Sequence, residues 1–111
     1  MKKRILGKFT RRVCYNKGFK RCWAEGNILD QMGIKVNMRF NKIVSQGKVS
    51  IVFTESGRQK INGTTDRPIL DLNGKFLNVL GDATFYEMTF YNTIESNFVD
   101  LLEITPTENV A

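Results

Sequence analysis

Histidine is absent from this 111-residue sequence, and cysteine, proline and tryptophan are scarce, with two, two and one residues respectively. Without histidine, the chain has no Ser-His or Cys-His nucleophile pair, no histidine-ligated zinc and no histidine general base. Two cysteines, Cys14 and Cys22, fall short of the four ligands of a structural zinc site. We therefore expect a non-enzymatic protein with neither a metal nor another cofactor, and we assign no catalytic residue.

Long apolar runs are also missing. The longest, such as residues 49–53, are far below the roughly 20 residues that span a bilayer, so we expect no membrane partner. Lys8, Arg11 and Arg12 interrupt the stretch in which a signal peptide would be apolar. This pattern predicts a cytoplasmic protein. In that compartment Cys14 and Cys22 are expected as two free thiols, although they could pair across adjacent strands.

Acidic residues are absent from residues 1–22, which hold nine lysine or arginine residues. Residues 62–111 have the opposite balance, with two basic and eight acidic residues. Such asymmetry favours a polyanionic partner for the basic end, nucleic acid above all. The alternative is that charges which only confer solubility happen to cluster there.

An eight-residue pattern occurs twice, at 26–33 and again at 74–81. Each copy reads glycine, polar, large apolar, leucine, Asp or Asn, any residue, Met or Leu, glycine. This spacing predicts a short amphipathic helix ended by a glycine with positive φ, at Gly33 and at Gly81. The alternative is a chance match between two leucine-rich segments.

The residues around each helix also correspond, since alternating apolar positions predict similar strands in both halves. The predicted strands are 19–23, 36–40 and 49–53 in the first half, and 69–72, 86–90 and 98–104 in the second. Glycine at position 47 suits a tight hairpin between the second and third strands of the first half. Two further strands, 4–9 and 12–15, are predicted ahead of the first half.

These elements predict one domain over residues 1–106, followed by a tail. The expected boundaries are a first half at 18–54, a linker at 55–67, a second half at 67–104 and a tail at 107–111. One half alone has too small an apolar face to be stable, so we expect the two to close on each other about a pseudo-twofold axis.

The repeated unit resembles the AbrB-type swapped-hairpin barrel, most closely its SymE-like branch. The motif of that branch is a strand, Gly-x-aromatic-Leu-x-x-small-Gly, a strand, a glycine-containing hairpin and a strand, and Phe76 occupies the aromatic position of the second copy. The family's Gly-Asp before the middle strand survives only at Gly81-Asp82. The resemblance covers about residues 18–104. It implies a mainly β fold, a small β-barrel built from two pseudo-symmetric halves, each with one short helix, plus the N-terminal strands.

The same resemblance implies nucleic-acid binding, to DNA or to RNA. AbrB-type regulators and antitoxins bind DNA, and the SymE-like branch is associated with toxicity through RNA or the nucleoid. Each chain of an AbrB-type dimer gives one half-barrel, whereas this chain would contain both halves. Monomer and homodimer therefore both stay open.

Six cations in the basic segment are the candidates for phosphate contact, since phosphates supply most of the affinity of a basic binder. They are Lys8, Arg11, Arg12, Lys17, Lys20 and Arg21. The pairs Arg11-Arg12 and Lys20-Arg21 are the favoured phosphate contacts, because a hairpin through Lys17-Gly18 would place the two pairs on adjacent strands. Tyr15, Phe19 and Trp23 interleave with these cations as base-stacking groups do. Aromatic residues at strand spacing are more often core or cross-strand residues, which is the interpretation we favour.

Two other functions stay open. The chain could be a small phage-type inhibitor that binds a protein partner, such as a nucleic-acid-processing enzyme, with its acidic second half imitating phosphate. It could also be a carboxylate-dependent nuclease, the only enzyme class that the composition permits. The carboxylates for such a site would be Asp66, Asp71, Asp82, Glu87, Glu95 and Asp100. Their scatter along the sequence favours a solvated surface instead.

Overall fold

The computed structural model describes residues 3–93 and 98–108, which form a mainly β structure with two short helices. In chain order the elements are β1 (Arg4–Arg12), β2 (Cys14–Asn16), β3 (Phe19–Glu25), α1 (Asn27–Gln31), β4 (Arg39–Ser45), β5 (Lys48–Phe53), β6 (Gln59–Lys60), β7 (Asn62–Thr64), β8 (Arg67–Asn73), η1 (Lys75–Leu80), β9 (Phe85–Asn92) and β10 (Leu101–Thr107). No helix in these residues is long and apolar enough to cross a membrane.

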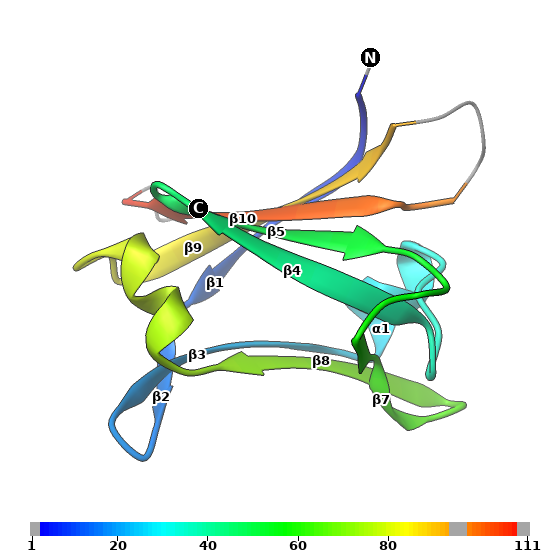
Figure 1. The fold of residues 1–111 in the computed structure, drawn as a ribbon, viewed down its shortest axis with the longest axis horizontal. Helices are drawn as coiled ribbons and strands as arrows, with labels where there is room; N and C mark the ends of the chain where they lie inside the picture. Colours follow the sequence, from blue (N-terminus) through cyan, green and yellow to red (C-terminus); the bar gives the residue numbers. More distant parts are fainter. Residues whose placement is uncertain (1–2, 94–97, 109–111) are drawn as a thin grey trace.

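The strands form two antiparallel sheets that face each other (Figure 1). The larger sheet has the order β1-β9-β10-β5-β4-β6, and the smaller has the order β2-β3-β8-β7. Side chains alternate along each strand, so one set from each sheet points between the layers. Ile51, Phe90 and Leu102 from the larger sheet and Leu70 and Leu72 from the smaller are buried there. This shared interior is the hydrophobic core.

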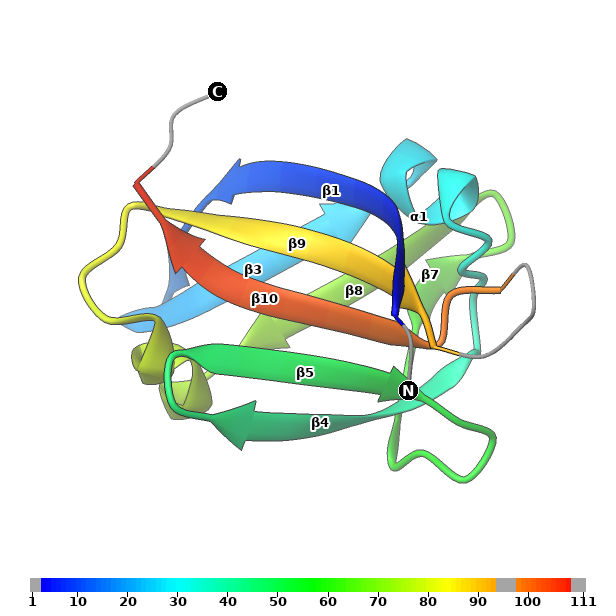
Figure 2. The same cartoon turned by 90° about the horizontal axis from the view of Figure 1, so that it is seen from above.

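Two corners connect the sheets, each through one buried residue. Val13 lies between β1 and β2, and Ile61 lies between β6 and β7. Val13 donates its backbone N–H to the carbonyl of Thr84, and Ile61 donates to that of Met38, each at 2.8 Å. At each corner an edge strand of the larger sheet continues into an edge strand of the smaller one. Figure 2 shows the larger sheet from above, with β1 beside β9 and β10 beside β5.

The strand order of each sheet is symmetric about its central pair. If β1 to β5 are relabelled β6 to β10, and β6 to β10 are relabelled β1 to β5, each sheet shows its original order when read from the other end. This relabelling maps each central pair onto itself, β5 with β10 in the larger sheet and β3 with β8 in the smaller. Each of the first five strands therefore has a counterpart, five strands later in the chain, at the matching position of the same sheet.

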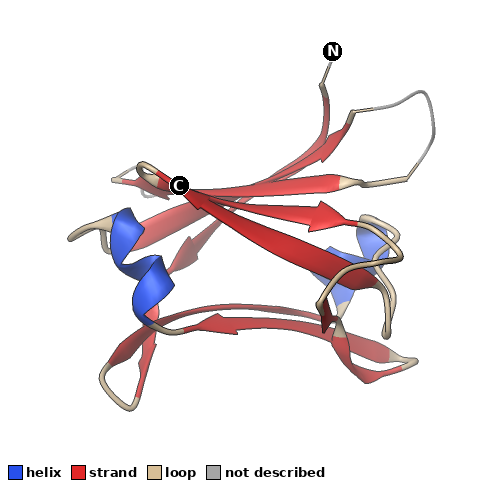
Figure 3. Cartoon of the chain, in the orientation of Figure 1, coloured by secondary structure: helices blue, strands red, loops and turns tan. Residues whose placement is uncertain are grey.

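The two short helices lie at opposite ends of the layers (Figure 3). Gly33 follows α1 with φ 74° and Gly81 ends η1 with φ 65°, so the predicted positive φ at both glycines is confirmed. The helices are not identical, because α1 is α-helical and η1 is a 3₁₀ helix. Gly81 has ψ −145°, which is an extended conformation open to glycine and not the left-handed helical one.

One predicted strand is misplaced. The strand expected at 36–40 begins only at Arg39, because the chain turns at Asn37, where φ is 73°. The backbone N–H of Asn37 donates to the carbonyl of Ile61, at 2.8 Å, which fixes this turn against the second corner. The corresponding strand of the second half, predicted at 86–90, is confirmed, since β9 buries Tyr86, Met88 and Phe90 as the alternation predicts.

Other predicted boundaries also shift. The linker expected at 55–67 contains β6 and β7, and the strand expected at 98–104 is β10, which starts at Leu101 and runs to Thr107. Pro106, expected near a frayed end, lies within β10. Proline fits there because β5 pairs with β10 only as far as Ile104, so β9 is the only neighbour at Pro106. The tight hairpin at Gly47 is present, with Ser45 opposite Lys48.

Candidate nucleic-acid interface

The fold brings part of the basic N-terminal segment against the acidic second half. Because β1 pairs with β9, Lys8 lies beside Glu87, with 3.7 Å between the ammonium and the carboxylate. Lys3 and Lys48 both contact Glu103, at 3.3 and 3.1 Å. Burial opposes ionisation of Glu103, but the two ammonium groups outweigh it and lower its pKa. The charge asymmetry of the sequence is thus partly cancelled in the folded chain.

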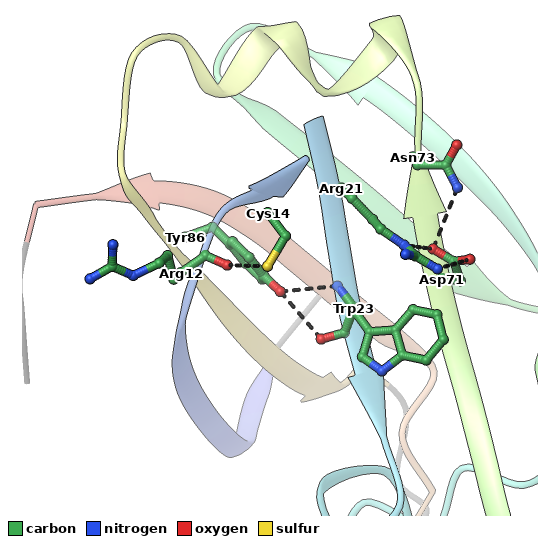
Figure 4. Close-up of polar contacts among 7 residues, drawn as sticks. All are labelled: Arg12, Cys14, Arg21, Trp23, Asp71, Asn73 and Tyr86. Carbon is green, nitrogen blue, oxygen red and sulfur yellow. Dashed lines mark hydrogen bonds and ion pairs between the residues drawn. The ribbon is translucent and has the colours of Figure 1, made fainter. Parts of the chain in front are cut away.

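Arg21 is also held by a carboxylate. It donates two hydrogen bonds to Asp71 on the neighbouring strand β8, both at 2.9 Å, and its guanidinium lies 4.4 Å from the centre of the Trp23 ring (Figure 4). The hydrogen bond from Arg21 lowers the pKa of Asp71. A bidentate pair of this kind uses two of the five N–H donors of the guanidinium and balances its charge, which weakens its attraction for a phosphate. The structure therefore places Arg21 in a cross-strand ion pair.

A second ion pair lies on the outer face of the smaller sheet. Arg67 of β8 approaches Glu25 of β3 to 2.6 Å, and this contact lowers the pKa of Glu25. With Arg21 and Asp71, the face then has two cations matched by two anions. Such a balanced surface has little attraction for a polyanion.

Four of the candidate cations form no ion pair within residues 3–93 and 98–108. They are Arg11, Arg12, Lys17 and Lys20. Arg11 and Arg12 end β1, next to the Val13 corner, and the guanidinium of Arg12 lies 5.2 Å from the centre of the Phe85 ring. Lys17 and Lys20 belong to the hairpin that follows. Together these four cations form the unpaired basic surface.

The tip of the β2–β3 hairpin projects below the rest of the smaller sheet (Figure 1). Asn16 and Phe19 are paired across a two-residue turn in which Lys17 and Gly18 have φ of 53° and 87°. Two successive positive φ values are those of the I′ turn that matches the twist of paired strands. The turn holds the tip of this hairpin in one defined shape.

Two aromatic side chains on this hairpin lie outside the core. Tyr15, opposite Lys20, is 65% exposed, and Phe19, opposite Asn16, is 41% exposed. Neither ring therefore belongs to the core, but both residues are cross-strand partners, which is the other form of the favoured interpretation. Trp23, farther along β3, is half-buried and is covered by the guanidinium of Arg21.

A cavity of about 490 Å³ opens at the base of the hairpin, between β1 and β3. Its lining includes Arg11, Arg12, Arg21, Trp23 and Tyr86. The Tyr86 hydroxyl accepts the backbone N–H of Trp23 at 3.2 Å and donates to the Trp23 carbonyl at 3.4 Å, so it serves as the hydrogen-bonding partner of β3 at that point (Figure 4). Burial raises the pKa of Tyr86, which keeps this hydroxyl protonated.

Both cysteines are free thiols, as the sequence predicts. Cys14 is exposed and its thiol donates to the carbonyl of Arg12 at 3.6 Å, beside the cavity. Cys22 is buried, and burial raises its pKa to about 12. A thiol with so high a pKa is a poor nucleophile, because the thiolate is the reactive form.

The carboxylates considered for a nuclease are spread over the molecule. Asp71 pairs with Arg21, Glu87 with Lys8, and Asp100 accepts the backbone N–H of Thr93 at 2.8 Å. Asp82 lines a small cavity with Glu108, and Glu95 lies outside the described residues. Among the residues that the structure describes, no group of three or more Cys, Asp or Glu side chains could hold a metal ion.

The structure thus brings four of the predicted site residues around one cavity, namely Arg11, Arg12, Arg21 and Trp23. Four others belong to the adjacent hairpin, namely Tyr15, Lys17, Phe19 and Lys20. Lys8 lies apart from both groups, farther along β1. Sequence reasoning considers Asp71 only as a nuclease carboxylate and Tyr86 only as a strand residue, and it does not place either at this site. The pattern places both on strands, but nothing local indicates that they contact β3. No protein-family model, curated protein or solved structure matches this chain.

Proposed function

We propose that this protein is a non-enzymatic nucleic-acid-binding protein that contacts phosphate groups with its unpaired basic surface. The observation that carries the proposal is that unpaired cations in the described part of the basic N-terminal segment gather around the Val13 corner and the hairpin that follows it. Arg21 and Lys8 each lie next to a carboxylate, whereas Arg11, Arg12, Lys17 and Lys20 are left at one end of the molecule. Unpaired cations gathered on a rigid strand and hairpin are what a phosphate backbone binds.

The architecture supports a second part of the proposal, that the chain is an internally duplicated barrel of the AbrB and SymE-like type. Each sheet has a strand order that is unchanged when the first five strands are exchanged with the last five. Val13 and Ile61 have the same role at the two corners, and Gly33 and Gly81 follow the two helices with positive φ. In this proposal the protein acts as a DNA- or RNA-binding regulator, an antitoxin or a SymE-like toxin.

The placement of the acidic residues argues against phosphate mimicry. Asp71, Glu87 and Glu103 of the second half each contact a cation of the same chain. Paired carboxylates of this kind do not form a row of free negative charges that could replace a nucleic-acid backbone. The protein-binding inhibitor is for this reason the weaker proposal.

The proposal is tested by removing the unpaired basic surface. A variant with Arg11, Arg12, Lys17 and Lys20 changed to glutamine should bind DNA and RNA more weakly whatever their sequence. The slope of log affinity against log salt should fall by about 0.7 to 0.9 for each phosphate that the variant no longer binds. Binding is measured by fluorescence anisotropy with labelled oligonucleotides over a series of salt concentrations. Folding should survive, because exposed charges contribute less than about 1 kcal/mol each.

A matched control replaces four other exposed cations, Lys35, Arg58, Lys60 and Lys75, with glutamine. This control removes the same net charge but leaves the N-terminal surface intact. Its affinity should fall far less than that of the first variant. Equal losses in both variants, or no binding by the unaltered protein, would overturn the proposal.

A further inference from the structure

The exposed aromatic residues of the β2–β3 hairpin, Tyr15 and Phe19, lie outside the hydrophobic core of the described chain. Side chains alternate along a hairpin, so Tyr15 with Lys20 faces one side and Phe19 with Asn16 faces the other. One side of the tip therefore carries an exposed ring opposite a cation, and the other side carries an exposed ring opposite an amide. Removing an aromatic ring from water is favourable. Two rings exposed at one tip gain this stabilisation only when a ligand covers them.

The cavity at the base of the hairpin has the size and lining of a site for one nucleotide. Its volume of about 490 Å³ lies within the ordinary range for small-molecule sites, about 300 to 1,000 Å³. Arg11 and Arg12 supply positive charge beside it, and the half-buried Trp23 supplies aromatic surface, whereas Tyr86 is only 1% exposed. The one carboxylate among the described lining residues, Glu25, is paired with Arg67. Neither Arg11 nor Arg12 is held by a carboxylate in the described part of the chain. A phosphate and a base could be accommodated together.

We propose that the preferred ligand is a single-stranded nucleic acid, whose bases stack on Tyr15 and Phe19 and enter the cavity beside Trp23. This inference rests on the proposed function and specifies its substrate class. Bases in a duplex stack on one another, so a duplex offers the hairpin only its phosphates and groove edges. A single strand also offers the faces of its bases, and each stacking contact contributes about 1 to 3 kcal/mol.

The test separates stacking from charge. Tyr15→Ala and Phe19→Ala are prepared with Phe98→Ala as the control, since Phe98 is 72% exposed and lies in the connection between β9 and β10. The probes are labelled oligothymidylate, oligouridylate and a DNA duplex of the same length. Each hairpin variant should lose about fivefold to a hundredfold in affinity for the single strands, with little change for the duplex. Phe98→Ala should bind as the unaltered protein does.

Trp23 is the only tryptophan of the chain, so its fluorescence reports on the cavity directly. Unlabelled oligothymidylate should quench its emission as it binds, and the Arg11→Gln and Arg12→Gln variant should require more oligonucleotide for the same quenching. Unchanged emission on binding would overturn the assignment of the cavity. Thermal unfolding of every variant verifies that the fold is retained.

The outcomes distinguish this inference from the function on which it rests. If the duplex binds as tightly as the single strands and the alanine variants match the unaltered protein, the single-strand assignment is wrong. Should the glutamine variant of the basic surface still lose affinity in that case, the nucleic-acid-binding function stands. If no nucleic acid binds at all, both proposals fail.

Discussion

Two hairpins at opposite edges of the smaller sheet have the same backbone pairing and different side chains. In the β2–β3 hairpin a two-residue turn, Lys17-Gly18, joins the strands. In the β7–β8 hairpin the corresponding turn is Thr65-Asp66. Each hairpin follows a buried corner residue, Val13 in one case and Ile61 in the other. Equivalent positions in the fold are thus occupied by a basic turn and by an acidic one.

The side chains next to these turns differ as much as the turns themselves. Tyr15 faces Lys20 in the first hairpin, whereas Gly63 faces Pro68 in the second. The first pair offers a ring and a charge to a ligand, and the second offers neither. Two hairpins with matching positions in the sheet therefore differ in the groups that they expose, and the proposed binding function assigns a ligand only to the first. Mutations at the corners, at the glycines and at Asp71 test this difference.

The largest effect is expected at the corners. Ile61→Ala should lower the free energy of unfolding by about 2 to 5 kcal/mol, because the smaller side chain leaves a cavity at a fully buried position. Val13→Ala removes fewer atoms and should cost about 1 to 3 kcal/mol. Chemical denaturation measures both values. A loss of nucleic-acid affinity by Ile61→Ala under conditions where it remains folded would contradict the purely structural role of that corner.

A smaller difference is expected at the glycines of the two hairpins. Both have positive φ, but a Cβ on Gly63 would lie 2.2 Å from the carbonyl oxygen of Arg67, whereas a Cβ on Gly18 would meet nothing within 4 Å. Gly18→Ala should therefore cost only about 1 kcal/mol, which is the strain of the backbone conformation. Gly63→Ala should cost more than about 2 kcal/mol, since backbone must also shift. Equal melting temperatures for the two variants would contradict this comparison.

The smallest effect concerns the ion pair that holds Arg21. Asp71→Asn should free Arg21 for phosphate, raise affinity for oligothymidylate by about two- to tenfold and increase the salt slope by about 0.7. Asp66→Asn is the control, because it removes the same charge from the turn of the other hairpin, and it should change affinity less. Anisotropy titrations measure both. Equal gains would mean that only net charge matters.

The same pair predicts a dependence of stability on pH. Folding lowers the pKa of Asp71, so the contribution of the ion pair is complete above the pKa of an unfolded aspartate, about 4, and is lost as the pH falls through the lower folded value. Asp71→Asn lacks this contribution at every pH. Chemical denaturation at a series of pH values should therefore show the unaltered protein to be more stable than the variant at neutral pH, with a difference that shrinks below about pH 4.

Local pattern is sufficient to predict some elements and not others. The helices and their glycines are predictable because their spacing and their turn chemistry lie within eight residues. The strand expected at 36–40 is misplaced because the alternation of Val36, Met38 and Phe40 is the same in an extended segment and in one that turns at Asn37. That turn is fixed by Ile61, which is distant in sequence. The short strands β6 and β7 escape prediction for the same reason, since they depend on their neighbours for pairing.

The candidate site is predictable in outline only. Lys17, Lys20 and their turn follow from residues close together in the sequence, and the turn is where it is expected. The expected placement of Arg11 and Arg12 on the strand next to Lys20 is wrong, because the chain turns the Val13 corner and leaves both arginines on β1 of the larger sheet. Whether a cation is free depends on residues far along the chain. The sequence favours Arg21 as a phosphate contact, and only the pairing of β3 with β8 shows that Asp71 lies next to it. Exposure of Tyr15 likewise follows from the projection of the hairpin tip below the rest of the smaller sheet, which alternation cannot show.

The pairing of β1 with β9 has a consequence for synthesis on the ribosome. β1 is made well before its partner, since Lys8 lies opposite Thr89 and β9 is translated only after β2 to β8. β4 and β5, in contrast, pair across the turn at Gly47 as soon as they leave the exit tunnel. Contacts between residues so distant in sequence form slowly because the intervening loop must first be closed. Arg11 and Arg12 thus reach their final positions only once β9 has been translated.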